Sequence, residues 1–135
     1  MSSFIFTLTN RSLILFFMLF MVLFTCRNTK AEILIDGTYI SASGKQIVLE
    51  LNISSRRPVN LIVEQFLDPG NFILTTSPGA KKRTSGKIKW LFRNISDRRL
   101  SISIRLRSPL KGTISAIIRY RDPDSGQFIE SQVIP

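Results

Sequence analysis

The chain has 135 residues, with 19 lysines and arginines against 9 aspartates and glutamates, one cysteine and no histidine. The lack of histidine excludes Ser-His-Asp and Cys-His catalysis and every zinc site that contains histidine. A single cysteine excludes an internal disulfide and an all-cysteine metal cluster, whereas a hydrophobic fraction of 44% allows one packed core.

The first 31 residues are expected to be a signal peptide. An uncharged apolar run of 14 residues extends from Leu13 to Cys26, with Arg11 before it. This run is shorter than the roughly 20 residues that cross a bilayer as a helix, and it suits the apolar region of a secretory signal. Thr29-Lys30-Ala31 offers small residues at the two positions that signal peptidase reads, so we expect cleavage before Glu32.

Two alternatives for this segment stay open. Residues 13–26 could remain as an uncleaved membrane anchor, or Cys26 could be acylated as in a lipoprotein. Contact with a membrane is expected only in these two cases. Otherwise the mature protein, residues 32–135, is secreted or periplasmic and contains no cysteine, so it relies on its core for stability.

The remainder of the chain predicts β-strands, because apolar and polar residues alternate. Between Leu100 and Arg107 every second residue is leucine or isoleucine, and those between are serine or arginine. Eight strands are expected at residues 33–40, 46–54, 59–67, 72–76, 87–92, 100–107, 112–121 and 127–134. Trp90 is expected in the core. Short strands separated by Pro, Gly, Asp and Ser clusters predict an all-β antiparallel sandwich of about seven or eight strands.

Turn and core residues from Pro58 to Glu130 follow a known pattern. A strand at 58–64 leads into Leu67-Asp68-Pro69-Gly70-Asn71-Phe72, then into Gly86-Lys87-Ile88-Lys89-Trp90, and residues 112–126 fit a last hairpin. This pattern resembles the immunoglobulin-like repeat modules of bacterial cell-surface proteins, with Asp68 as an insertion and with one copy in place of a tandem array. The resemblance implies an immunoglobulin-like β-sandwich and an extracytoplasmic location, but no chemistry.

No motif in the chain predicts catalysis. Asp124-Ser125-Gly126 matches the triplet of aspartic proteases, but Asp122 and Pro123 precede it, and a solvated hairpin turn is the better interpretation. A mechanism built on carboxylates alone would use Glu50, Glu64 or Asp68, and no spacing supports one. We therefore expect no enzyme, and no catalytic, cofactor or metal site.

The distribution of charge is the one feature that indicates a function. Residues 81–121 hold thirteen lysines and arginines and a single acid, Asp97. Alternation directs three pairs of cations away from the apolar faces, namely Lys87 with Lys89, Arg105 with Arg107, and Arg119 with Arg121. If their strands are neighbours, these six cations cover one sheet surface, with Lys81, Lys82, Arg83, Arg98 and Arg99 at loop tips.

Such a surface would attract polyanions through a field that salt screens. The candidate binding residues are Lys81, Lys82, Arg83, Lys87, Lys89, Arg105, Arg107, Arg119 and Arg121. The expected partner is an anionic envelope component or an acidic protein; nucleic acid is not expected, because no aromatic residue is expected on that surface. Two alternatives remain. In the first, the cations serve solely to keep the sheet soluble and to protect its edge strands from pairing. In the second, the protein is a subunit of a larger surface or secretion assembly, held by strand or sheet packing.

Overall fold

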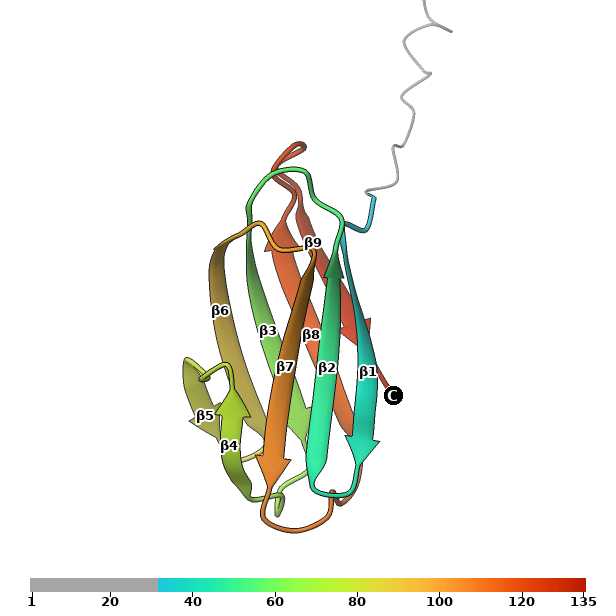
Figure 1. Cartoon of the computed structure of the whole chain (residues 1–135), viewed down its shortest axis with the longest axis vertical. Helices are drawn as coiled ribbons and strands as arrows, with labels where there is room; N and C mark the ends of the chain where they lie inside the picture. The colour runs from blue at the N-terminus through green and yellow to red at the C-terminus, as the bar shows by residue number, and fades with distance from the viewer. Residues whose placement is uncertain (1–31) are drawn as a thin grey trace, which may run out of the picture. The chain divides into compact units, whose positions relative to one another are not determined.

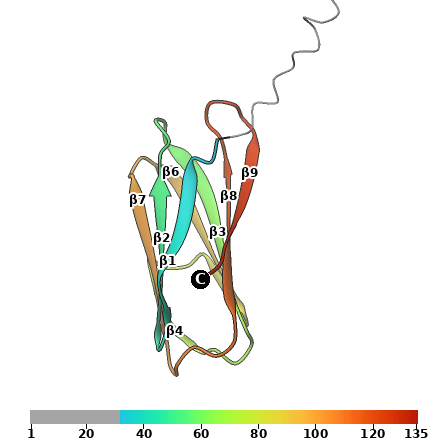
Figure 2. The same ribbon diagram turned by 90° about the vertical axis from the view of Figure 1, so that its right-hand side faces the viewer.

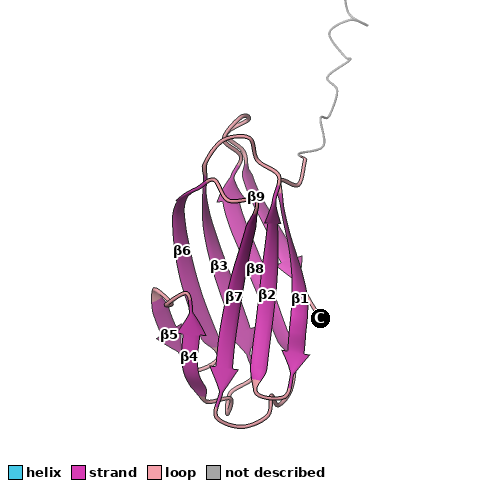
Figure 3. Cartoon of the chain, viewed as in Figure 1, coloured by secondary structure: helices cyan, strands magenta, loops and turns pink. Residues whose placement is uncertain are grey.

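Residues 32–135 form nine β-strands and no helix in the computed structural model, which describes this part of the chain (Figure 3). The strands are β1 (Ile35–Ser43), β2 (Gln46–Ile53), β3 (Val59–Leu67), β4 (Ile73–Ser77), β5 (Lys82–Thr84), β6 (Lys87–Ile95), β7 (Arg99–Leu106), β8 (Ile114–Arg121) and β9 (Phe128–Val133). The predicted signal peptide and Cys26 lie outside the described residues. Within 32–135 there is no helix of the length and apolarity needed to cross a membrane.

The strands form two antiparallel sheets that pack face to face. The four-stranded sheet has the order β1-β2-β7-β4, and the five-stranded sheet has the order β5-β6-β3-β8-β9. Figure 1 shows β2 and β7 in front of β3 and β8, and Figure 2 shows the two layers from the side. The prediction of an all-β sandwich is confirmed.

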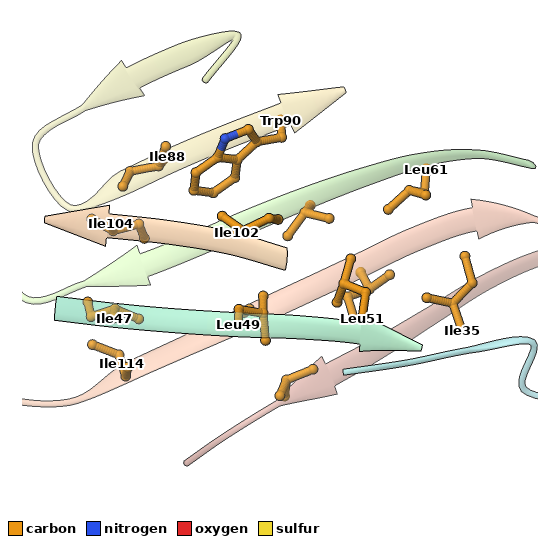
Figure 4. Close-up of a cluster of buried hydrophobic side chains, with 14 of the residues drawn as sticks. Ile35, Ile47, Leu49, Leu51, Leu61, Ile88, Trp90, Ile102, Ile104 and Ile114 are labelled. Carbon is orange, nitrogen blue, oxygen red and sulfur yellow. The ribbon is translucent and has the colours of Figure 1, made fainter. Parts of the chain in front are cut away.

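One apolar core fills the space between the sheets (Figure 4). Of the residues between Leu100 and Arg107 that alternation predicts to face inward, Ile102, Ile104 and Leu106 are each 1% exposed, and Leu100 packs partly buried against the core. Ile47 on β2 and Ile118 on β8 are fully buried in the same core. Trp90 is 1% exposed, and its indole N–H donates a hydrogen bond of 2.9 Å to the carbonyl oxygen of Pro78. The facing of the alternating strands and the core position of Trp90 are therefore confirmed.

The short strand β5 is not among the eight that the sequence predicts. Its residues Lys82, Arg83 and Thr84 are all exposed and pair with the first residues of β6 across a tight turn. Gly86 in that turn has φ +86, a conformation that glycine adopts at little cost. Lys82 and Arg83 thus belong to an edge strand, and the prediction that they lie at a loop tip is wrong. Three polar residues show no alternation from which a strand could be expected.

A polar contact bridges the two sheets within the core. The hydroxyl of Tyr39 on β1 donates a hydrogen bond of 2.8 Å to Oε1 of Gln65 on β3. Gln65 is 1% exposed, and its Nε2 donates to the carbonyl oxygen of Ser115 at 2.9 Å. Burial raises the pKa of Tyr39 to about 12, although the hydrogen bond to Gln65 acts to lower it. The hydroxyl therefore keeps its proton at neutral pH, and the buried amide is satisfied.

The loop after β3 is fixed to the loop before β8. Asn71 Nδ2 donates to the carbonyl oxygen of Lys111, and the Lys111 N–H donates to Asn71 Oδ1, each at 2.9 Å. Asp68 Oδ2 accepts the Thr113 N–H at 3.0 Å. Gly112 has φ +74, and a Cβ atom there would overlap the Asp68 carboxylate. Asp68, the insertion in the resembled pattern, thus holds the two loops together.

We expect Gly112→Ala to lower the free energy of unfolding by about 3 kcal/mol or more, because the left-handed backbone and the overlap with Asp68 both oppose the methyl group. Gly126→Ala is the matched control, since Gly126 has φ +72 and no atom near its Cβ position. The control should lose only about 1–2 kcal/mol. Urea unfolding followed by the fluorescence of Trp90 measures both, and equal losses would contradict the role of Asp68.

Candidate functional site

The six paired cations lie on opposite surfaces of the sandwich. Lys87 and Lys89 on β6, and Arg119 and Arg121 on β8, belong to the five-stranded sheet. Arg105 lies on β7 of the four-stranded sheet, and Arg107 follows that strand. The prediction of one surface with six cations is therefore wrong. The reason is that β7 pairs with β2 and β4, and with neither β6 nor β8.

The outer surface of the five-stranded sheet gathers most of the predicted residues, and we call it the basic face. Its cations include Lys82, Lys87, Lys89, Arg119 and Arg121, and its acids include Glu64 and Glu130. Strands β6 and β8 pair with the two sides of β3, so the cations flank this central strand. Arg83 pairs with the inward-facing Ile88 and points to the other side of β5. Lys81 precedes β5 at the same edge.

Glu64 lies on the central strand of the basic face and contacts three of its cations. Its Oε1 lies 3.4 Å from Nζ of Lys87 and 3.8 Å from Nζ of Lys89. Its Oε2 accepts a hydrogen bond of 2.6 Å from Nη1 of Arg119. The Glu64 side chain is 7% exposed, whereas those three cations are 37–44% exposed. The negative charge is thus covered, and an approaching anion meets the cations first.

These contacts keep Glu64 ionised. Burial acts to raise the pKa of Glu64, but the hydrogen bonds and charges of Arg119 and Lys87 outweigh it, so the pKa lies below its usual value. Arg119 also donates from Nε to Glu130 at 2.6 Å, and this bond, followed by the one to Glu64, raises the pKa of Arg119. Arg119 is therefore held by two carboxylates and serves mainly to organise the surface.

Two aromatic rings share the basic face. Nζ of Lys87 lies 5.8 Å from the centroid of the Phe66 ring, and Cζ of Arg121 lies 5.1 Å from that of Phe128. Phe66 is half-buried, whereas Phe128 is 76% exposed. The prediction that no aromatic residue shares this surface is wrong, because these rings come from β3 and β9, which only strand pairing places beside the cations.

Asp124-Ser125-Gly126 forms part of the turn between β8 and β9. Oδ1 of Asp122 accepts the N–H groups of Asp124 at 2.8 Å and Ser125 at 3.4 Å. The bond from Asp124, more than the others, lowers the pKa of Asp122. The interpretation of this triplet as a turn is confirmed. Residues 32–135 contain no group of three or more Cys, Asp or Glu side chains placed to hold a metal ion.

The sequence matches no model of a known protein family and no curated protein. The charges, contacts and exposed side chains of residues 32–135 are thus the features that indicate a function.

We expect Glu64→Gln to lower the free energy of unfolding by about 2 kcal/mol at pH 7. The variant leaves three cations without their shared counterion, although their exposure to water reduces the loss below that of a fully buried pair. Glu130→Gln, at a carboxylate that is 59% exposed, should lose less than about 0.5 kcal/mol.

The effect of Glu64→Gln should also depend on pH. Because the pKa of Glu64 is lower in the folded than in the unfolded chain, its stabilisation is complete above the unfolded pKa and is lost as the pH falls through the folded pKa. The difference between wild type and variant should thus shrink as the pH falls from the unfolded pKa, about 4.3, through the lower pKa of the folded state. Urea unfolding at several pH values measures it, and a difference that does not change with pH would contradict the assignment.

Proposed function

We propose that this protein is a non-catalytic, immunoglobulin-like module of the cell envelope that binds anionic partners through its basic face. The observation that supports the proposal is the gathering of five cations on the basic face, three of which cover the carboxylate of Glu64. Its setting outside the cytoplasm is supported by the signal peptide that the apolar run at residues 13–26 predicts. The partner is an anionic envelope component or an acidic protein.

The strand order supports the immunoglobulin-like assignment. Constant-type immunoglobulin domains have seven strands, in sheets of order ABED and CFG. If the hairpin of β5 and β6 is left out, the remaining seven strands take the letters A to G in chain order. The four-stranded sheet then has the order ABED, and β3-β8-β9 has the order CFG.

The hairpin of β5 and β6 is thus an addition to the seven-strand arrangement, and it supplies much of the positive charge. It lies at the free side of β3 and brings Lys82, Lys87 and Lys89 to the basic face. Lys82 and Lys89 stand opposite each other in the strand register, and like charges in that position repel. An anion bound above them would relieve this repulsion, which favours a role in binding over one in folding.

A subunit held in a larger assembly by strand or sheet packing stays the alternative. Its support is the exposure of apolar side chains on two edge strands, with Ile40 on β1 at 61% and Phe128 on β9 at 76%. Apolar contacts persist in concentrated salt, whereas attraction to a polyanion is screened. The salt dependence of binding therefore separates the two functions.

We expect the full chain, kept soluble by a non-ionic detergent, to bind heparin with an affinity that falls steeply with salt. Lys82→Gln with Arg121→Gln should reduce the slope of log affinity against log salt concentration by about 2, since two cations leave the basic face and neither forms an ion pair with an acid of residues 32–135. The measurement is the binding constant at several salt concentrations.

Arg56→Gln with Arg98→Gln is the matched control. It removes the same charge at a hollow near the end of β2, outside the basic face, and should leave the slope unchanged. If both double variants have the same slope, heparin binding depends only on the net charge of the protein and not on the basic face. If the affinity for heparin does not change with salt concentration, the proposal of polyanion binding is wrong.

A further inference from the structure

Figure 1 shows the turn that joins β1 to β2 at the lower end of the four-stranded sheet. A hollow opens on the outer surface of this sheet beside that turn. Its lining includes Ser41, Ser43, Lys45, Leu74, Arg105 and Arg107. These residues come from β1, from the turn, from β4 and from the end of β7. The hollow lies on the opposite sheet from the basic face.

Strand pairing places Arg105 in the middle of this hollow. Arg105 is opposite Gln46 of β2 on one side and Thr75 of β4 on the other. Leu106 between the two arginines is buried, so Arg105 and Arg107 leave the same side of the chain, about 7 Å apart along it. An irregularity in β4 leaves Leu74 48% exposed, as an apolar wall beside them.

The turn brings a third cation. Gly44 has φ +64 and reverses the chain, and the carbonyl oxygen of Lys45 accepts the Leu106 N–H at 2.8 Å. This bond sets Lys45 next to the end of β7. Ser41 and Ser43 also line the hollow, and the Ser41 hydroxyl donates to the carbonyl oxygen of Gln46 at 3.3 Å.

The three cations have no counterion within residues 32–135. Lys45, Arg105 and Arg107 are exposed, and none of their side chains forms an ion pair or a hydrogen bond in this part of the chain. No carboxylate lines the hollow. By contrast, Arg99 at the other end of β7 lies 3.5 Å from Glu50. The hollow is thus a local concentration of positive charge with the Ser43 hydroxyl beside it.

We propose that this hollow binds a single tetrahedral oxyanion, a phosphate or a sulfate group. Guanidinium groups bind two oxygens of such an anion at once, and an ammonium group adds a point charge. The Ser43 hydroxyl can donate a further hydrogen bond to a remaining oxygen, whereas the Ser41 hydroxyl donates to the carbonyl oxygen of Gln46 at 3.3 Å. The three cations gather around one open hollow of about 540 Å³ and can converge on one anionic group, whereas the cations of the basic face spread over three strands. This site does not depend on the proposed function, because none of its residues belongs to the basic face.

The test is a titration of the ¹⁵N-labelled full chain, in non-ionic detergent, with inorganic phosphate, sulfate and glucose 6-phosphate, with chloride at equal ionic strength as reference. We expect saturable shifts of the backbone amide signals of Ser43, Lys45, Arg105 and Arg107. Arg105→Gln with Arg107→Gln should weaken binding at least about tenfold, as the loss of two charge-assisted contacts implies. Unchanged fluorescence of Trp90 would show that this variant is folded.

Arg56→Gln with Arg98→Gln removes two cations outside both this hollow and the basic face. It is the control and should bind phosphate as the wild type does. Shifts that do not saturate, or that persist in the Arg105 and Arg107 variant, would overturn the proposal. If glucose 6-phosphate binds more tightly than phosphate, and Leu74→Ser reduces its affinity, the hollow binds the terminal phosphate of a larger ligand. If phosphate binds as tightly as glucose 6-phosphate, or more tightly, the ligand is the free ion. The heparin experiment tests the cations of the basic face, and this titration tests the residues of the hollow. The failure of one therefore does not imply the failure of the other.

Discussion

The burial of every second strand residue in one shared core determines where the charges of this protein can go. Ile47, Ile104 and Ile118 fill the space between the sheets, together with Trp90, and leave no room there for a lysine or arginine. An unpaired charge in that core would cost several kcal/mol. Cations on strands β6, β7 and β8 therefore project from the two outer surfaces, and the function of the protein is to be sought there.

The central position of β3 organises the larger of these surfaces. Because β6 and β8 pair with its two sides, cations from segments distant in the sequence meet around one carboxylate, that of Glu64. Glu64 stabilises the cluster without cancelling it, since its side chain lies below those of Lys87 and Lys89. Such an arrangement keeps positive side chains in defined positions and still presents them to solvent.

The two outer surfaces differ in how their cations are balanced. On the five-stranded sheet, Arg119 is held by two acids, and the remaining cations spread over three strands. On the four-stranded sheet, Lys45, Arg105 and Arg107 gather in one hollow that no carboxylate lines. The first arrangement favours a broad surface that salt screens easily, and the second favours directed contacts to one small anion. One sandwich can thus support two kinds of anion recognition.

The sequence by itself determined eight of the nine strands, the side that β2, β6, β7 and β8 bury, the core position of Trp90 and the hairpin turn at Asp122, because alternation and turn chemistry are local properties of the chain. Only the tertiary structure decided that Arg105 and Arg107 lie opposite the other paired cations, that Phe66 and Phe128 share the basic face, and that Lys82 belongs to a strand. These facts depend on which strands pair. Pairing joins residues far apart in the sequence through backbone hydrogen bonds, and these bonds leave no periodic pattern in the side chains.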